Sequence, residues 1–383
     1  MTTPQLHGHV SSGFGKVADA FADNFRDRGD TGAACAVYAD GKPVVDLWAG
    51  HTARGPWTPQ TRSILFSVSK GITTICVLMA VDAGVIDLEE PVATYWPEYA
   101  VNGKGATTVR QVLAHQAGLP APEKPLTAAD LSAWLPVSNA LAAQAPLWQP
   151  GSTFAYHAMT FGWLAGEVLR RTTGKRPAEW LAEHIAKPLA LNATFGIDPH
   201  STDFAAQLQP LPTTDPEGAA ALLPADMDLF DRSMTMAGAL GTRGEDLFVT
   251  ANSRDFLAIE NPGGNLATTA RDLARLYAAT VGEVDSTRLL RPETVRDARR
   301  PLSWGTSYFG IDDGNRWGTG VMIDSRRRAM AGPGSFGHDG AGGQLGFANL
   351  ELNVSFGYHT IRPGGYPDDR AEALCDALRA CVS

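Results

Sequence analysis

The chain has 383 residues, 44% of them hydrophobic and 19% charged, which suits two domains or one domain with a large insertion. A formal charge of −9 without a basic stripe argues against a nucleic-acid partner, and four scattered cysteines argue against a disulfide framework or a structural zinc site. No basic N-terminal region precedes an apolar stretch, and no apolar run is long enough to span a bilayer. We therefore expect a cytoplasmic protein that does not bind a membrane.

The N-terminal part of the chain predicts a helix, a strand pair and a second helix. Residues 15–28 place their apolar side chains on one face, as an amphipathic helix does. Residues 33–50 contain two β-favouring runs joined at Asp40-Gly41, a strong hairpin signal. The stretch "FSVSKGITTICVLMAVDAG", residues 66–84, then predicts an apolar helix that ends at Gly84.

The middle third changes to helical spacing with glycine or proline stops. It predicts four helices, at residues 107–120, 131–144, 160–175 and 177–191. Residues 197–260 are rich in loop-forming residues, and we expect them to shape a substrate pocket.

The last part returns to strands. Residues 265–280 predict a helix capped by Thr268 or Thr269, three strand-like stretches follow, and a final amphipathic helix covers about 369–381. These elements predict an α+β fold, in which both chain ends build one antiparallel sheet flanked by helices. The expected domains are a discontinuous sheet domain, residues 10–85 and 260–383, and a mostly helical inserted domain, residues 86–259. The two terminal helices would cover one face of the sheet, and the helix after Ser67 the other.

Ser67 and Lys70 form the only Ser-x-x-Lys motif in the chain. Residues three apart share a helix face, so the Lys70 amine can reach the Ser67 hydroxyl and remove its proton if burial keeps the amine neutral. The Ser67 N–H would also point at a developing oxyanion at the helix N-terminus. A capping serine and a lysine that extends to solvent would give the same pattern, so further motifs have to decide.

Two such motifs occur later in the chain. Tyr156 follows a Pro-Gly turn and precedes an apolar helix, where a phenol can carry a proton to or from a leaving group. His338-Asp339-Gly340 is expected to open a glycine-rich strand against which a substrate can lie, with the Ala341 N–H as a second oxyanion donor. A buried tyrosine and an ordinary edge strand are the alternatives.

Together these motifs resemble the serine β-lactamase and penicillin-binding-protein superfamily, and most closely its class C branch with the family VIII carboxylesterases. The resemblance covers nearly the whole chain, because five blocks occur in family order: "GAACAVYADGKPVVDLWAG", "LFSVSKGITT", "TVRQVLAHQAGLP", "QPGSTFAYHAMTFGWLAGEVL" and "NPGGNLATTARDLARLYAAT". It implies that Ser67 is the acylated nucleophile, Lys70 its general base and Tyr156 a proton shuttle. It also implies that His338, Gly340 and Ala341 bind substrate or the oxyanion, without a metal or cofactor.

Two departures from the β-lactamase pattern point to the substrate. The family's Tyr-x-Asn is Tyr156-His157-Ala158 here, so an amide that would hold a lactam's acylamino group is missing. The lysine of Lys-Thr-Gly is His338, a weaker anchor for a substrate carboxylate. Both changes favour small uncharged esters as substrates. The alternatives are an amide hydrolase or acyltransferase, then a β-lactamase or D-Ala-D-Ala peptidase, then an inactive binding module.

A second serine lies in a stretch that resembles a different nucleophile motif. Ser335 lies in "PGSFG", which nearly matches the Gly-x-Ser-x-Gly elbow of α/β-hydrolases, but a proline takes the first glycine position and a strand is expected to follow where that elbow needs a helix. We therefore expect Ser335 to be structural.

Overall fold

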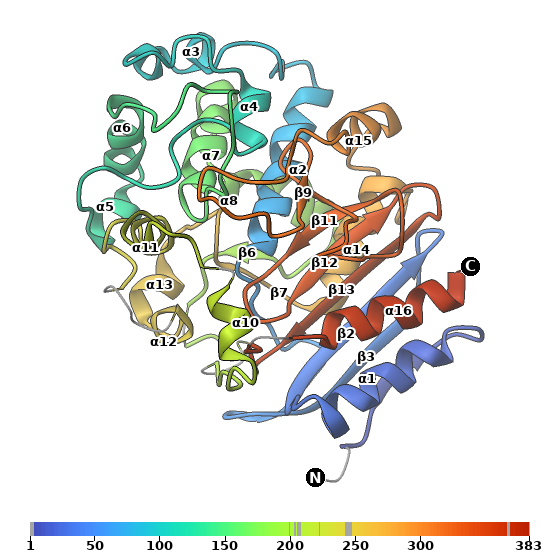
Figure 1. The fold of residues 1–383 in the computed structure, drawn as a ribbon. Helices are drawn as coiled ribbons and strands as arrows, with labels where there is room; N and C mark the ends of the chain where they lie inside the picture. Colours follow the sequence, from blue (N-terminus) through green and yellow to red (C-terminus); the bar gives the residue numbers. More distant parts are fainter. Residues whose placement is uncertain are drawn as a thin grey trace.

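The computed structural model describes residues 4–198, 200–202, 204, 208–221, 223–241, 247–365 and 368–382. Its main feature is an antiparallel sheet in which three N-terminal strands lie side by side and are followed by the strands of the C-terminal third (Figure 1). The strand order is β1 (His7–Val10), β3 (Lys42–Thr52), β2 (Gly32–Ala39), β13 (Val354–Thr360), β12 (Leu345–Asn349), β11 (Ser335–Asp339), β10 (Met322–Ile323), β9 (Arg316–Trp317) and β8 (Ser303–Trp304), and β4 (Gly55–Pro56) pairs with β3. A second sheet has the order β5 (Ser63–Ile64), β7 (Leu266–Thr268) and β6 (Thr194–Phe195).

The hairpin β2–β3 confirms the prediction made from Asp40-Gly41. Both residues have positive φ, 49° and 73°, as a two-residue turn between twisted strands requires. The register pairs Ala39 with Lys42 across that turn, and β2 then pairs with β13 on its other side. The two ends of the chain thus meet in the centre of the sheet, which confirms the expected α+β fold.

Helices cover both faces of the main sheet. Helices α1 (Gly15–Asp27) and α16 (Arg370–Val382) pack side by side on one face, where Val17, Phe21 and Leu378 belong to a buried apolar cluster (Figure 1). On the other face α14 (Ala270–Val281) lies against β2, β12 and β13. Helix α2 (Val68–Asp82) contacts β11 and the helical part of the chain. The expectation that α2 covers this second face is therefore incomplete, because α14 covers its centre.

The middle of the chain is mostly helical. The helices and helical turns are α3 (Val92–Tyr95), η1 (Pro97–Ala100), α4 (Val109–Leu113), α5 (Ala128–Ala133), α6 (Leu135–Ala143), α7 (Thr160–Thr173), α8 (Pro177–Trp180), η2 (Leu181–Ala186), α9 (Lys187–Leu189), α10 (Pro216–Ala220), α11 (Met227–Thr235), α12 (Leu247–Ala251) and α13 (Arg254–Ala258), with α15 (Pro292–Ala298) nearer the C-terminus. Helix α7 ends at Gly174, which adopts the left-handed conformation that glycine accepts without strain.

Three details of the predicted elements were wrong. The helix predicted for 131–144 is two helices, because Trp134 between them has a φ of 67°. The helix predicted for 265–280 begins only at Ala270, where the Thr269 side chain accepts a hydrogen bond from the Asp272 N–H, and the residues before it form β7. His338 and Asp339 close strand β11 instead of opening a strand, and Gly340 begins the turn into β12.

The division into a sheet domain and a helical domain stays a prediction. Strand β6, from the predicted helical domain, pairs with β7, from the predicted sheet domain. Among the described residues, the helices are all too short or too polar to cross a membrane.

Candidate active site

Ser67 is the N-cap residue of helix α2, and the chain enters it through a strained conformation. Phe66 has a φ of 46°, uncommon for a residue with a bulky side chain, and is buried against Phe248. The Ser69 hydroxyl donates to the Phe66 carbonyl and accepts from the Leu266 N–H, which ties this turn to β7. Strand β7 and the buried aromatic ring thus fix the position at which Ser67 faces the cavity.

Lys70 lies one helical turn after Ser67, with its Nζ 3.0 Å from Ser67 Oγ. The same amine donates to the Gly263 carbonyl at 2.7 Å, and the side chain is completely buried. Burial lowers the pKa of Lys70 well below its usual range, and the opposing effect of Asp339 is smaller. A neutral amine held on one side by a carbonyl presents its lone pair to the serine hydroxyl, as a general base must.

Tyr156 stands beside both residues. Lys70 Nζ lies 4.8 Å from the centre of its ring, and a hydrogen bond with Ser67 tends to lower the pKa of the phenol. Burial outweighs this effect and raises the pKa of Tyr156 above its ordinary value. The phenol therefore keeps its proton at neutral pH and can donate it, while Lys70 is the group able to accept one.

Aromatic rings hold Tyr156 in place. Trp317 of β9 stacks on it with ring centres 5.2 Å apart, and His115 lies 5.0 Å away on another side. The neighbouring His157 accepts from the Leu119 N–H at 3.1 Å through Nε2, so its Nδ1–H donates to the Ala155 carbonyl. Its own N–H donates to His115 Nδ1. The chain on both sides of Tyr156 is thus fixed by buried hydrogen bonds.

Ala341 lies in the turn between β11 and β12 and lines the same cavity as Ser67. Within the described part of the chain, the structure shows no hydrogen-bond acceptor for the backbone N–H of either residue. Gly340 precedes Ala341, and its N–H donates to the Gln344 carbonyl at 2.8 Å, which closes the turn. Two unengaged amides on one cavity wall are the donors that an oxyanion hole requires.

His338 is not placed as predicted. Its side chain is 1% exposed and is not part of the cavity wall, so it does not face the cavity. Burial, with a smaller effect of Lys70, lowers the pKa of His338 to about 4, and its Nδ1–H donates to the Asp339 carbonyl at 2.6 Å. The ring instead packs at 5.3 Å from Trp317 and 6.1 Å from Tyr156. His338 therefore acts as a neutral packing group behind the proposed proton carriers.

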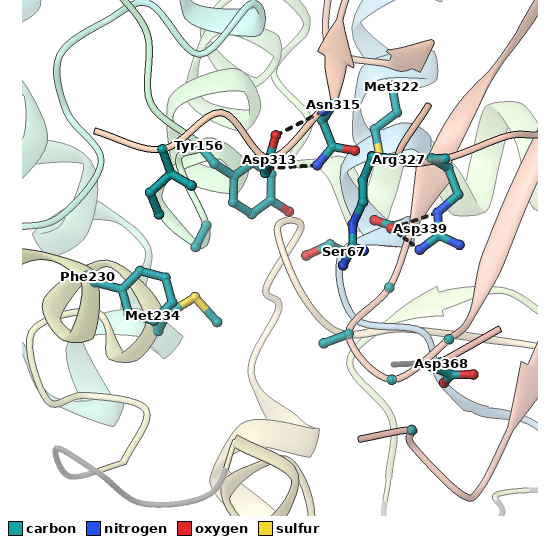
Figure 2. A pocket seen from close by; sticks show the side chains of 18 of the residues that line it. Ser67, Tyr156, Phe230, Met234, Asp313, Asn315, Met322, Arg327, Asp339 and Asp368 are labelled. Atoms are coloured by element: carbon teal, nitrogen blue, oxygen red, sulfur yellow. Dashed lines mark hydrogen bonds and ion pairs between the residues drawn. The ribbon is translucent and has the colours of Figure 1, made fainter. Parts of the chain in front are cut away.

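The cavity in front of Ser67 has a volume of about 660 Å³ (Figure 2). Figure 2 shows Phe230 and Met234 on one side, Ser67 and Tyr156 in the centre, and Asp339 and Asp368 on the other side. The apolar part of the wall includes Phe154, Ala158, Pro210, Leu211, Pro224, Phe230, Met234, Phe248, Phe309, Ile311, Trp317 and Met322. Several of these belong to residues 197–260, which confirms that the loop-rich stretch shapes the pocket.

Some functional positions were missed by sequence reasoning. Gly263, whose carbonyl binds Lys70, lies in "NPGGN", where the Pro-Gly-Gly turn signals a close backbone approach. A Cβ on Gly162 of α7 would lie 2.3 Å from the Gly263 nitrogen, so this approach needs glycine. Trp317 carries no local signal, because its stacking on Tyr156 depends on residues about 160 positions apart in the chain.

Two other serines are buried and do not line the cavity. Ser335 begins β11 and accepts a hydrogen bond from Asn349 Nδ2 at 3.1 Å, which fits the structural role expected for it. Ser63 Oγ lies 2.6 Å from His359 Nδ1, but both side chains are buried. Among the described residues there is also no group of three or more His, Cys, Asp or Glu side chains that could hold a metal ion.

Comparisons with known proteins show which family and fold the chain is similar to. The family model described as Beta-lactamase matches residues 19–380. A curated relative, "Esterase/beta-lactamase LipL" of Mycobacterium tuberculosis (strain ATCC 25618 / H37Rv), is 35% identical over 379 residues, which cover 92% of this chain and 82% of the relative.

Solved structures are similar over the full length. A family VIII carboxylesterase has a TM-score of 0.84 and 32% identity, and the match covers 98% of this chain and 100% of the other. A penicillin-binding-protein homologue from Caulobacter crescentus has a TM-score of 0.85 and 30% identity, with the same coverage of both chains.

Proposed function

The chain belongs to the beta-lactamase family and is a serine hydrolase of that fold, and on this premise we propose that it hydrolyses carboxylic esters of small acyl groups. The observation that carries the proposal is the 3.0 Å contact between Lys70 Nζ and Ser67 Oγ in a buried setting that lowers the pKa of the lysine. This contact supplies both a nucleophile and a base that is ready at neutral pH.

The first half-reaction would acylate Ser67. Lys70 Nζ takes the Ser67 proton while Oγ bonds to the ester carbonyl carbon, and the resulting oxyanion accepts hydrogen bonds from the Ser67 and Ala341 N–H groups. The tetrahedral intermediate then collapses and its bond to the alcohol oxygen breaks. That oxygen receives a proton from Tyr156, which Lys70 reprotonates.

The second half-reaction would release the acid. A water molecule gives a proton to Lys70 and attacks the acyl carbonyl, and the same two amides hold the new oxyanion. When the intermediate collapses, Ser67 Oγ leaves and takes the proton back from Lys70. Amide cleavage or transfer of the acyl group to another acceptor would use the same intermediate and remains an alternative.

Ester substrates are favoured over β-lactams by two residues, one on the cavity wall and one buried behind it. Ala158 lines the cavity where the family's β-lactamases carry an asparagine amide, so the wall offers no side-chain amide at that position. His338 stands where they carry a lysine, and it is buried and neutral near pH 7. Names of relatives support both activities, since one is called a carboxylesterase and another an esterase/beta-lactamase. β-Lactam hydrolysis is therefore the second candidate.

The test compares 4-nitrophenyl esters from acetate to octanoate with nitrocefin, for the native chain, Ser67→Ala and Ser335→Ala. We expect ester turnover that is abolished by Ser67→Ala, kept by Ser335→Ala, and much faster than nitrocefin turnover. Rapid nitrocefin hydrolysis by the native chain would instead establish the second candidate. Loss of activity only in Ser335→Ala would contradict the mechanism, and no turnover of any substrate would favour a binding module.

A further inference from the structure

Arg370, the first residue of α16, is an arginine with almost no exposure, buried behind the candidate oxyanion hole. Its side chain is 1% exposed, and its guanidinium donates hydrogen bonds to three residues. Nη1 donates to Asp30 at 2.6 Å, and Nε and Nη2 donate to the two oxygens of Asp368 at 2.9 and 2.6 Å. Nη2 also donates to the Gly342 carbonyl at 3.1 Å. Gly342 directly follows Ala341, so this guanidinium bonds to the turn that presents the Ala341 amide.

The turn at residues 340–344 needs an external support. Its sequence, "GAGGQ", contains three glycines, and Gly342 and Gly343 have φ values of 90° and 99°. Glycine gives these positions access to many conformations, so the turn has little intrinsic preference for one direction of the Ala341 N–H. Within the described part of the chain, the Gly342 carbonyl accepts two hydrogen bonds, from the Gly364 N–H at 3.0 Å and from Arg370.

The neighbouring segment is pressed against this turn. A Cβ on Gly342 would lie 2.3 Å from the Pro363 Cβ, and one on Gly343 would lie 2.5 Å from an Asp368 oxygen. Asp368 is in turn held by both nitrogens of the Arg370 fork. One guanidinium thus bonds to the turn directly and also fixes the carboxylate that packs on it.

We propose that Arg370 is a positioning residue that holds the Ala341 amide in the geometry needed to bind the oxyanion. The inference rests on the proposed function, because it gives a residue outside the cavity wall a role in the proposed ester hydrolysis. Oxyanion donors act only when they are oriented before the charge develops, and small misplacements of such groups reduce rates strongly. Arg370 touches neither the reacting atoms nor the cavity, so its effect has to pass through Gly342 and through Asp368.

The charge of Arg370 also matters for folding. Asp30 is buried, and the Tyr358 and Thr360 hydroxyls donate to it at 2.7 and 2.8 Å. Removing the guanidinium would leave this carboxylate buried without a counterion, which is strongly destabilising. A lysine keeps the charge but lacks the planar fork that reaches Asp30, Asp368 and Gly342 together. Arg370→Lys therefore separates the pairing of charge from the positioning of the turn.

The chain offers a matched control in Arg170. This arginine donates through Nε and Nη2 to the two oxygens of Glu167, both at 2.8 Å, and Glu167 is completely buried in the helical part. Arg170→Lys therefore breaks an equivalent fork away from the turn. A second variant, Arg370→Met with Asp30→Asn, removes the fork without leaving Asp30 as a buried, unpaired carboxylate, and it serves where Arg370→Lys does not fold.

The experiment measures three quantities for each variant: kcat and KM with 4-nitrophenyl butanoate, the inhibition constant of a phenylboronic acid, and the rate at which a fluorophosphonate labels Ser67. For Arg370→Lys we expect kcat to fall about 10- to 100-fold at a nearly unchanged KM, part of the loss known for deleting an oxyanion donor. Boronate affinity and the labelling rate should fall in parallel, because both adducts place an oxygen in the oxyanion hole. Arg170→Lys should keep all three at the native level.

Three outcomes would overturn the inference. Loss of thermal stability in Arg370→Lys and the double variant, with native kcat, boronate affinity and labelling rate, would make Arg370 a folding residue only. Equal losses in Arg170→Lys would show a general effect of destabilisation. Absence of labelling and turnover in the native chain would refute the proposed function itself, and this inference with it.

Discussion

Ser67 Oγ and Lys70 Nζ are 3.0 Å apart on the first turn of α2, and the lysine is completely buried. Its amine also donates to the Gly263 carbonyl, which accepts a hydrogen bond but supplies no full negative charge to stabilise an ammonium. The pair therefore combines a hydroxyl with an amine whose pKa is lowered by burial.

Lys70→Met is predicted to abolish the base and to stabilise the protein. We expect kcat/KM for 4-nitrophenyl butanoate to fall by about 10²- to 10⁴-fold, the range typical for loss of general base catalysis. Because a buried amine is costly, the variant should also unfold at a higher temperature than the native chain. Steady-state kinetics and calorimetry check both effects, and a variant that is less active and also less stable would contradict the second.

The pH profile of kcat/KM follows from the same residue. Activity needs neutral Lys70, so it should be present above the folded-state pKa of this amine and be lost as pH falls through it. Burial lowers that pKa well below the ordinary lysine value of about 10.4, so the native chain should be fully active near neutral pH. A profile that only begins to rise near pH 10 would show that Lys70 keeps an ordinary pKa.

Tyr156→Phe is predicted to affect esters according to their leaving group. The buried phenol keeps its proton at neutral pH and is placed to protonate the departing alcohol. 4-Nitrophenolate leaves without needing that proton, whereas an alkoxide does need it. We therefore expect ethyl butanoate to lose about 10²-fold or more in kcat/KM and 4-nitrophenyl butanoate much less. Equal losses for both esters would assign Tyr156 to positioning alone.

Phe230→Ala is predicted to shift the preference for acyl length. The ring lies on the cavity wall supplied by α11, and its removal leaves apolar space there (Figure 2). The ratio of kcat/KM for octanoate over butanoate esters should rise by about tenfold, comparable to the effect of a methylene or two in an apolar pocket. Phe14→Ala is the matched control, because this ring packs at the start of α1, outside the cavity wall. The same shift in both variants would disprove the assignment.

Buried histidines are predicted to make the protein sensitive to acid. Burial lowers the pKa of His157 and His338 to about 4 and that of His359 to about 3, against about 6.5 in an unfolded chain. As pH falls from 6.5 towards 4, the unfolded state takes up protons that the folded state does not, so stability is lost. Each such histidine contributes a slope of up to about 1.4 kcal/mol per pH unit.

His359→Gln tests this pH dependence away from the active site. His359 packs against Trp57 and Ser63. We expect the variant to show a shallower dependence of the free energy of unfolding on pH between 6.5 and 4, measured by urea titration. An unchanged slope would mean that this histidine does not titrate differently in the two states.

Local signals explain how much of this structure the sequence predicts. The hairpin at Asp40-Gly41 and the helix after Ser67 were predictable because turn type and helical apolar periodicity depend on residues that are close in sequence. The nucleophile and base were predictable because they are one helical turn apart, so their contact does not depend on the rest of the fold.

Contacts between distant segments explain the misses. Gly263 and Trp317 reach the site only through tertiary packing. The break at Trp134 reflects its buried indole, whose N–H donates to Glu167 at 2.7 Å, a contact that overrides the helical period. His338 was expected to face substrate because it occupies the position of the lysine of Lys-Thr-Gly. A sequence motif does not determine the direction of a side chain, and here the ring is buried in the core.

The most direct test of the central claim is to trap the acyl-enzyme. The native chain is quenched in acid during turnover of 4-nitrophenyl butanoate, digested, and mapped by mass spectrometry, with Ser67→Ala treated in the same way. We predict a butanoyl group on Ser67 of the native chain, and neither acylation nor ester turnover in Ser67→Ala. A butanoyl group on Ser335 or another residue, or full turnover by Ser67→Ala, would contradict the account.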